Sequence, residues 1–239
     1  MRNSMFKYAM LLIYLLLSFF PTTENLHAYT EERIKYEKSG DVIWEGYTDE
    51  KVVALTFDDG PSPKYTPLIL DILDKFNAKA TFFVTGSNAK KYPYLIYRQY
   101  LENHEIGNHT FNHDYRAENL KEELAKTATI IYEITGTTPT NFRPPEGVYN
   151  DEIVAIASEQ GYTVVLWSWD QDPKDWDRPG VDAIVNHVTS NISSGDIILL
   201  HDSGGNRSQT VEALPKILEF LDENGYKTIT VSEMIERTN

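Results

Sequence analysis

The sequence of 239 residues contains no cysteine. A disulfide framework and a lipidated cysteine at a membrane are therefore both excluded, and stability must come from packing. Basic residues are also few, because 22 Lys and Arg stand against 36 Asp and Glu, which gives a net charge of -14. Nucleic-acid binding requires a positive surface, so we expect no nucleic acid partner. No fixed-period repeat is visible, which argues against a structural repeat protein, and we expect a monomer.

Long apolar runs are confined to the N-terminus. Arg2 and Lys7 precede an apolar run from Ala9 to Phe20, and Ala28 follows as a small residue at a cleavage position. This order is typical of a secretory signal, and the run is shorter than the roughly 20 residues of a spanning helix. We therefore expect export, with this segment either cleaved after Ala28 or kept as an anchor that associates with the membrane.

The remaining chain divides by composition. Residues 29–51 are polar and mixed and are expected to be a short extension, while residues 52–239 are expected to form one catalytic domain. Seven β-branched or aromatic runs alternate there with helical stretches such as "YTPLILDILDKF". Such alternation predicts an α/β fold with about seven parallel strands, and a distorted (β/α) barrel of TIM type fits best. An open doubly wound sheet is the alternative, but the glycine-rich phosphate turn is missing after the first strand.

Two adjacent acids follow the first predicted strand. Asp58 and Asp59 come directly after "VVALTF", and Gly60-Pro61 ends the strand. One carboxylate can bind a cation while the other acts as a base on bound water. A turn in which Asp caps the next helix is the simpler explanation of this motif taken alone.

Histidines supply a second group of ligand candidates. His109 and His113 in "HTFNH" are four residues apart, a spacing that would place both imidazoles on one face of a helical turn. Together with a carboxylate they would form a metal site. His201 follows the strand "DIILL" and could protonate a leaving amine near neutral pH. Each histidine alone could equally be an ordinary packed residue.

A loop rich in acids follows the strand "YTVVLWSW". Asp172 is a candidate for orienting a cation or a histidine, and Trp176 for stacking on a sugar. Asp170 and Asp175 are interpreted as ordinary acidic loop residues.

A stiff turn follows the run "NF". Arg143 could pair with a base carboxylate, and Pro144 and Pro145 have no amide hydrogen, so Glu146 carries the first backbone donor that could bind an oxyanion. An "RPP" sequence is also common in simple rigid connections.

These motifs share one position relative to the predicted strands. Six of the candidates fall at or just after the C-terminal ends of separate predicted strands, where parallel α/β barrels build their active sites: Asp58, Asp59, His109, Arg143, Asp172 and His201. The common placement predicts an enzyme.

The same motifs resemble those of the polysaccharide deacetylases of the NodB-homology type, carbohydrate esterase family 4. "TFDDGPS", "HTFNH", "RPPEG", "DPKDW" and "LLHD" occur in the family's order across residues 52–236. The resemblance implies a hydrolase of N-acetyl groups that binds one divalent metal ion, with zinc expected and cobalt or another ion as alternatives. The metal ligands that it implies are Asp59, His109 and His113.

The resemblance also implies catalytic roles. Asp58 would be the general base, held by Arg143, and His201 would protonate the amine, tuned by Asp172. The oxyanion would meet the Glu146 amide, and Trp176 with Leu199 would line the acetyl pocket. Many relatives have tyrosine where this sequence has Glu146, which predicts an altered substrate preference.

The expected substrate is an N-acetylated glycan outside the cell membrane, with peptidoglycan N-acetylglucosamine favoured. Chitooligosaccharide, N-acetylmuramic acid and exopolysaccharide are alternatives within the same chemistry. Removal of O-acetyl groups from xylan and a catalytically idle glycan-binding module are the remaining hypotheses.

Overall fold

The computed structural model describes residues 33–238, so the predicted signal segment lies outside the described residues. The chain divides into two compact units, residues 1–40 and residues 41–239. In the first unit, residues 33–39 are helical. Within residues 33–238, no helix combines the length and the apolar character needed to cross a membrane.

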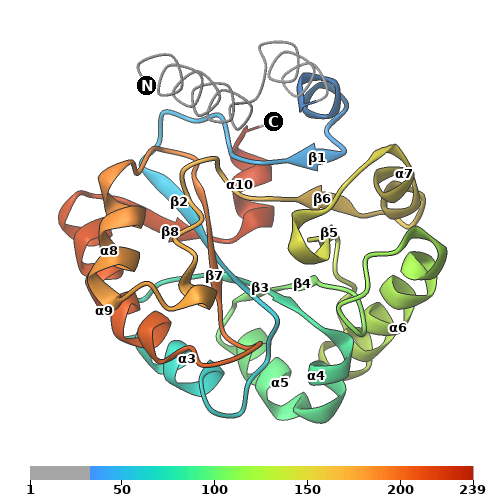
Figure 1. Ribbon diagram of the computed structural model, residues 1–239, viewed down its shortest axis with the longest axis horizontal. Coiled ribbons are helices and arrows are strands. Elements are labelled where there is room, and N and C mark those ends of the chain that lie inside the picture. Colours follow the sequence, from blue (N-terminus) through green and yellow to red (C-terminus); the bar gives the residue numbers. More distant parts are fainter. Residues whose placement is uncertain (1–32, 239) are drawn as a thin grey trace, which may run out of the picture. The chain divides into compact units, whose positions relative to one another are not determined.

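The second unit is an α/β fold in which parallel strands occupy the middle and helices lie around them (Figure 1). Its strands are β1 (Val42–Ile43), β2 (Val52–Asp58), β3 (Thr81–Val84), β4 (Glu105–Asn108), β5 (Asn141–Phe142), β6 (Thr163–Val165), β7 (Ile197–His201) and β8 (Lys227–Ile229). Its helices are α3 (Thr66–Lys75), α4 (Gly86–Lys91), α5 (Pro93–Leu101), α6 (Ala117–Thr135), α7 (Asp151–Glu159), α8 (Val181–Ser190), α9 (Ser208–Glu223) and α10 (Val231–Thr238). Two short 3-10 turns, η1 (Pro145–Gly147) and η2 (Asp175–Asp177), follow β5 and β6.

The strands pair in the order β1-β6-β5-β4-β3-β2-β7, and β8 pairs with the first residues of β2. The pairs between these strands are all parallel, as the sequence predicted. The two ends of this path are joined by an antiparallel bridge between Glu45 and Asp196 and by a hydrogen bond from the Ser168 amide to the Ile197 carbonyl. The sheet therefore curves into a distorted barrel with an irregular seam.

The sheet begins earlier than the sequence predicted. β1 lies within the stretch 29–51 that was expected to precede the domain, and it pairs with β6. Val42 and Trp44 are buried there. A strand of two residues inside a polar stretch leaves no periodic signal, which is why composition alone placed the boundary too late.

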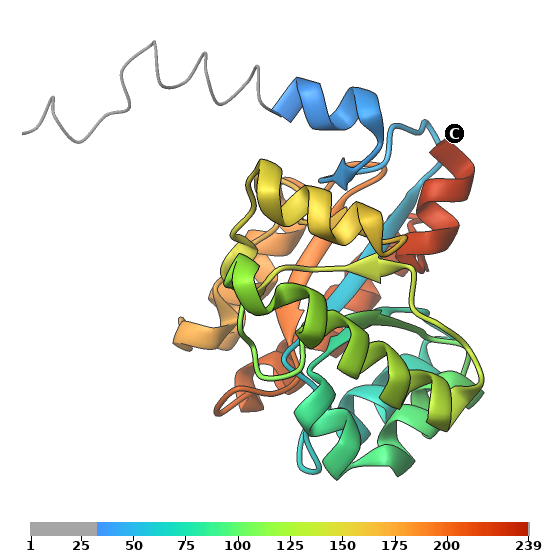
Figure 2. The same cartoon turned by 90° about the vertical axis from the view of Figure 1, so that its right-hand side faces the viewer.

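Alternation along β2 decides which of its side chains face the interior of the barrel. Val53, Leu55 and Phe57 belong to the core cluster shared with helices α3, α8 and α9. Since successive strand residues point to opposite faces, Thr56 and Asp58 lie on the other face, inside the barrel. Helices α6 and α7 cover the strands on the side of the barrel away from α8 and α9, and Figure 2 is viewed from that side.

Candidate active site

One cavity of about 490 Å³ opens where the C-terminal ends of β2, β4, β5 and β7 converge. The predicted site residues that line it are Asp58, Asp59, His109, His113, Glu146, Asp172, Trp176, Leu199 and His201. Arg143 does not line the cavity; it is fully buried and donates a hydrogen bond to Asp58, which does. Gly147 and Trp167 also line the cavity and were not among the predicted residues.

Strand register brings the two expected proton carriers together. Asp58 ends β2 and is the register partner of His201, which ends β7. Both are held by a parallel ladder, so their separation does not depend on flexible loops. The next residue, Asp59, has a φ of 73°. This left-handed turn redirects the chain, so that Asp59 lines the cavity together with Asp58 although strand alternation would separate them.

Arg143 fixes the carboxylate of Asp58 from the barrel interior. Its side chain is fully buried, and Nη1 donates to Asp58 Oδ1 at 2.9 Å and to Thr56 Oγ1 at 2.6 Å. Nε and Nη2 donate to the carbonyl oxygens of Val165 and Leu166 at 3.1 and 2.7 Å. The guanidinium also lies over the Phe83 ring, 4.2 Å from its centroid. A buried guanidinium with hydrogen bonds on several sides holds the Asp58 carboxylate in a fixed position beside the cavity.

Asp59, His109 and His113 form a group that can hold a metal ion, because one ligand atom from each lies within 4.8 Å of the others. Nε2 of His109 and Nε2 of His113 are 3.6 and 3.4 Å from Asp59 Oδ1. The other nitrogen of His109, Nδ1, lies 2.7 Å from the Arg143 carbonyl oxygen, which directs Nε2 toward the group. Two imidazole nitrogens and one carboxylate oxygen are donors that suit zinc and similar divalent ions, so these residues fit the expected cofactor.

The two histidines do not lie on a helical turn, in contrast to the prediction from their spacing. Residues 109–113 form an irregular loop, in which Thr110 and His113 both have a φ of 63°. Glu123 of α6 secures this loop by accepting hydrogen bonds from the amides of Phe111 and Asn112 at 2.9 and 2.6 Å. A carboxylate of the following helix therefore holds the loop that was expected to be a helical turn.

Burial and charge within the group shift the pKa values of its members. Burial alone would raise the pKa of Asp59, but the hydrogen bond and charge of His109, with the charges of His201 and His113, hold that pKa below its ordinary value. Burial lowers the pKa of His113. These shifts favour the ionised carboxylate of Asp59 and the neutral imidazole of His113, which are the forms that bind a cation. At His109, burial is outweighed by the charge of Asp58 and the hydrogen bond to Asp59, so the pKa is raised.

The partner of His201 is Asp175 and not Asp172. Nδ1 of His201 lies 2.7 Å from Asp175 Oδ1, and the His201 amide donates to Asp175 Oδ2 at 3.0 Å. Asp172 lines the cavity, but its Oδ1 accepts from the amide of Lys174 at 3.0 Å. The η2 turn folds Asp175 back against β7, where Thr210 of α9 also donates to it at 2.6 Å. This contact corrects the prediction, in which Asp175 was an ordinary loop acid.

Two further residues shape the cavity wall. Arg207 is buried and donates to the carbonyl oxygens of Ser203 and Trp176 at 2.6 and 3.3 Å, which ties the η2 turn to the loop after β7. Gly147 has a φ of 66°, and a Cβ there would meet the Trp167 ring at 2.5 Å. In the sequence, the close approach of Gly147 to Trp167 is indicated only by the glycine of "RPPEG".

The expected oxyanion donor lies in a second left-handed turn. Glu146 has a φ of 59° within η1 and lines the cavity. The turn follows two prolines, whose fixed φ values limit the paths that the backbone can take. The Glu146 side chain is exposed and therefore adds a carboxylate at the cavity mouth.

Comparison with known proteins agrees with this geometry. Residues 45–165 match the family model of polysaccharide deacetylases. The chain is 50% identical over 206 residues to a peptidoglycan-N-acetylglucosamine deacetylase of Bacillus cereus, covering 85% of this chain and 97% of the relative. It is 37% identical to a chitooligosaccharide deacetylase of Sinorhizobium fredii, covering 73% of this chain and 87% of the relative.

A solved structure is similar over the same region. The chain superposes on the Bc1960 peptidoglycan N-acetylglucosamine deacetylase, crystallised with 4-naphthalen-1-yl-N-oxidanyl-benzamide, with a TM-score of 0.79 and 36% identity. The superposition covers 83% of this chain and 94% of the other. Fold, site geometry and sequence identity thus agree, and the chain belongs to the polysaccharide deacetylase family.

Proposed function

We propose that the protein hydrolyses the N-acetyl groups of a glycan outside the cell membrane, with peptidoglycan N-acetylglucosamine as the favoured substrate. One observation carries the proposal. Asp58, held by Arg143 at 2.9 Å, lies beside the Asp59, His109 and His113 group and is the register partner of His201. This arrangement supports a base at Asp58 next to a cation site, with His201 as a proton donor on the neighbouring strand. The relatives named peptidoglycan deacetylases support this choice of substrate.

The chain's own residues account for each proton in the reaction. A divalent cation bound by Asp59, His109 and His113 would supply Lewis-acid polarisation of the acetamide carbonyl and of the attacking water. Asp58 accepts a proton from that water while the water oxygen forms a bond to the carbonyl carbon. The Glu146 amide donates a hydrogen bond to the resulting oxyanion.

Collapse of the tetrahedral species breaks the carbon–nitrogen bond, and acetate and an amine leave. The amine nitrogen needs a proton at this moment, and His201 supplies it. The hydrogen bond between Nδ1 and Asp175 leaves Nε2 of His201 for this transfer and stabilises the imidazolium form. Trp176 and Leu199, which line the cavity, enclose the acetyl group and exclude water from it.

Three alternative substrates differ only in the glycan, and a fourth differs also in the bond that is cleaved. Chitooligosaccharide, N-acetylmuramic acid and exopolysaccharide would present the same acetamide, and xylan would present an O-acetyl ester. A catalytically idle glycan-binding module is disfavoured because Asp58, Asp59 and His201 all line one cavity together with the two metal-ligand histidines.

Export is part of the proposal. Residues 1–28 would direct the chain across the membrane or hold it at the outer surface, where cell-wall glycans lie. The catalytic domain would then be the unit from Asp41 onward, acting as a monomer.

The decisive experiment measures acetate release from N-acetylglucosamine oligomers and from purified peptidoglycan by the chain beginning at Tyr29. Chelator should abolish the release and zinc should restore it. Asp59→Asn should abolish the release while glycan binding remains. A folded, zinc-loaded protein that releases no acetate from either glycan would overturn the proposal, and acetylated xylan would then be assayed.

A further inference from the structure

A second cavity, of about 680 Å³, lies at the barrel seam. It is lined by residues from three segments, 45–49 after β1, 168–170 after β6, and 191–196 before β7. None of its lining residues lines the catalytic cavity. The chain between β6 and α8 nevertheless connects the two, because residues 168–170 line the second cavity and Asp172 and Trp176 line the first.

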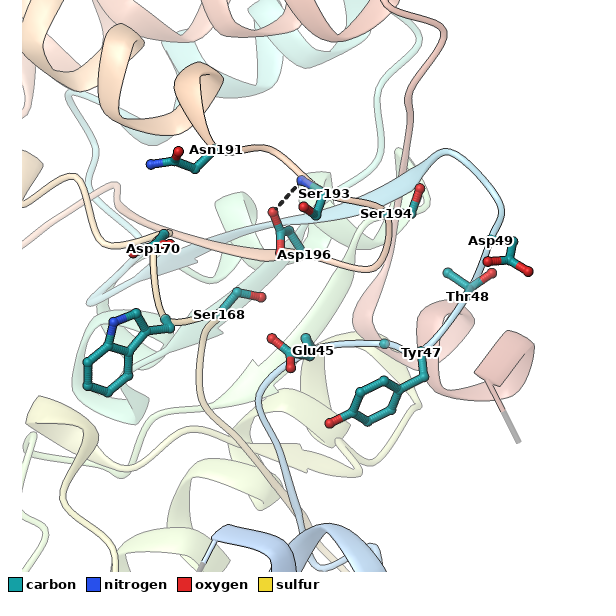
Figure 3. Close-up of a pocket in the computed structure, with 12 residues that line it drawn as sticks. Glu45, Tyr47, Thr48, Asp49, Ser168, Asp170, Asn191, Ser193, Ser194 and Asp196 are labelled. Atoms are coloured by element: carbon teal, nitrogen blue, oxygen red, sulfur yellow. Dashed lines mark hydrogen bonds between the residues drawn. The ribbon is translucent and has the colours of Figure 1, made fainter. Parts of the chain in front are cut away.

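The floor of the second cavity is held by a dense set of hydrogen bonds. Asp196 accepts from the Ser193 amide at 2.7 Å, which is the dashed contact in Figure 3, and from Gln171 Nε2 at 3.2 Å. Ser168 Oγ donates to the Trp44 carbonyl at 3.2 Å and accepts from the Ile197 amide at 3.0 Å. A floor fixed in this way keeps its shape without a ligand.

Two large aromatic side chains at this cavity face solvent. Trp169 is 72% exposed and Tyr47 is 66% exposed, the two highest values among the large hydrophobic residues that the structure describes as exposed. Both line the cavity. Flat aromatic rings beside hydroxyl and amide groups are suited to sugars, since the C–H face of a sugar ring packs on the aromatic ring while its hydroxyls form hydrogen bonds.

The charge of the lining distinguishes among sugars. Four carboxylates line the cavity, and none of the twelve lining residues is lysine, arginine or histidine. These acids are Glu45, Asp49, Asp170 and Asp196. Figure 3 shows Glu45 and Asp196 in the middle of the view, with Asp49 to one side and Asp170 to the other. Carboxylates repel an anionic glycan and attract a cationic one.

We propose that this cavity is a second glycan-binding site, which takes sugar units that carry a protonated amine. The inference rests on the proposed function, because hydrolysis of an N-acetyl group converts a neutral acetamide into such an amine. The ammonium would interact with the carboxylates and with the face of an exposed aromatic ring, where cations are attracted by the ring quadrupole.

Such a site would bind the enzyme to stretches of glycan that it has already deacetylated. A chain held at the second cavity presents its neighbouring acetylated units to the catalytic cavity at a raised effective concentration. Deacetylation of a polymer would then proceed in clusters, whereas deacetylation of a short oligomer would not benefit.

Calorimetric titration at low salt with a glucosamine tetramer and a glucose tetramer tests the proposal. Neither contains an acetyl group, so neither is hydrolysed, and the two differ in the amine. The glucosamine tetramer should bind at least about tenfold more tightly than the glucose tetramer, a difference of about 1.4 kcal/mol. This preference should decline as salt is added. Equal affinity, or no binding of the glucosamine tetramer, would overturn the proposal.

Matched tryptophan variants locate the binding. Trp169→Ala should weaken the binding of the glucosamine tetramer about tenfold and leave acetate release from an N-acetylglucosamine dimer unchanged. Trp176→Ala, in the catalytic cavity, should reduce acetate release from the dimer and leave the binding of the glucosamine tetramer unchanged. The double variant Asp49→Asn/Asp170→Asn, at two exposed positions, should abolish the preference for the amine and keep the affinity for glucose. Binding that depends on Trp176 and not on Trp169 would contradict the proposal.

The same measurements separate this site from the proposed reaction. Normal acetate release without Trp169-dependent binding would reject the second site alone. Trp169-dependent binding without acetate release from any N-acetylated glycan would reject the proposed reaction and retain the site.

Discussion

Nδ1 of His201 lies 2.7 Å from Oδ1 of Asp175, a residue that precedes it by 26 positions in the chain. The same carboxylate accepts hydrogen bonds from the His201 amide and from the Thr210 hydroxyl. Asp175 is therefore fixed on both oxygens, and it fixes the orientation of the imidazole in turn. The pKa of a histidine joined to an acid in this way depends on the acid.

The first prediction concerns the pH dependence of acetate release. Burial lowers the pKa of His201, but the hydrogen bond and charge of Asp175 outweigh this effect and raise that pKa above its ordinary value. A raised pKa keeps His201 protonated to higher pH, so activity that needs the imidazolium is lost as the pH rises through the raised value. Asp175→Asn should lower the pKa, move the alkaline limb of the rate profile to lower pH, and reduce the rate by about 10² to 10⁴.

Asp172→Asn is the matched control, because Asp172 also lines the cavity but is bonded to the Lys174 amide. The alkaline limb of the rate profile of this variant should lie at the same pH as in the unaltered protein. A shift in the Asp172 variant with none in the Asp175 variant would restore the assignment that the sequence suggested.

The second prediction concerns Arg143, whose loss would leave Asp58 buried without its partner. Arg143→Met should lower the free energy of unfolding by about 3–5 kcal/mol, since breaking a buried ion pair leaves an uncompensated charge. Urea unfolding measures this change. Arg116→Met, which removes an exposed arginine paired with Asp114, should have a much smaller effect. Equal effects would show that burial of the pair contributes nothing.

The third prediction concerns Glu123, which holds the loop that carries His113. Glu123→Ala should weaken zinc binding by about 10- to 100-fold, because residues that orient metal ligands typically contribute that much. Competition with a coloured zinc chelator measures the affinity. Glu122→Ala, at the neighbouring exposed position on α6, should leave it unchanged. Unaltered zinc affinity in the Glu123 variant would mean that the loop keeps its shape without this carboxylate.

The fourth prediction concerns substrate preference. Glu146→Tyr removes a carboxylate from the cavity mouth and keeps the backbone amide, so activity should persist while the rate on anionic peptidoglycan rises several-fold relative to neutral chitin oligomers. Acetate release on both glycans gives the ratio. Glu152→Tyr, at an exposed position on α7, should not alter it. The hypothesis fails if the ratio is the same in the Glu146 variant and the unaltered protein.

The fold class and the edge of the sheet at which the site lies follow from local patterns in the sequence. Each of the seven predicted runs contains a strand, and the candidates at their C-terminal ends gather at one cavity. Both features are local: apolar runs mark buried strands, and parallel strands end at a common edge. For the same reason the order of the motifs sufficed to identify the resemblance to the polysaccharide deacetylases.

Which side chains meet at the site depends on contacts that form between elements of the folded chain. The approach of Asp175 to His201 depends on the path of η2 and on Thr210 of α9, and the loop at His113 depends on Glu123 of α6. The short strand β1 becomes visible through its pairing with β6. Each of these contacts joins two different elements of the fold, so the free energy that fixes it comes from packing and hydrogen bonds that the periodicity of a single helix or strand does not record.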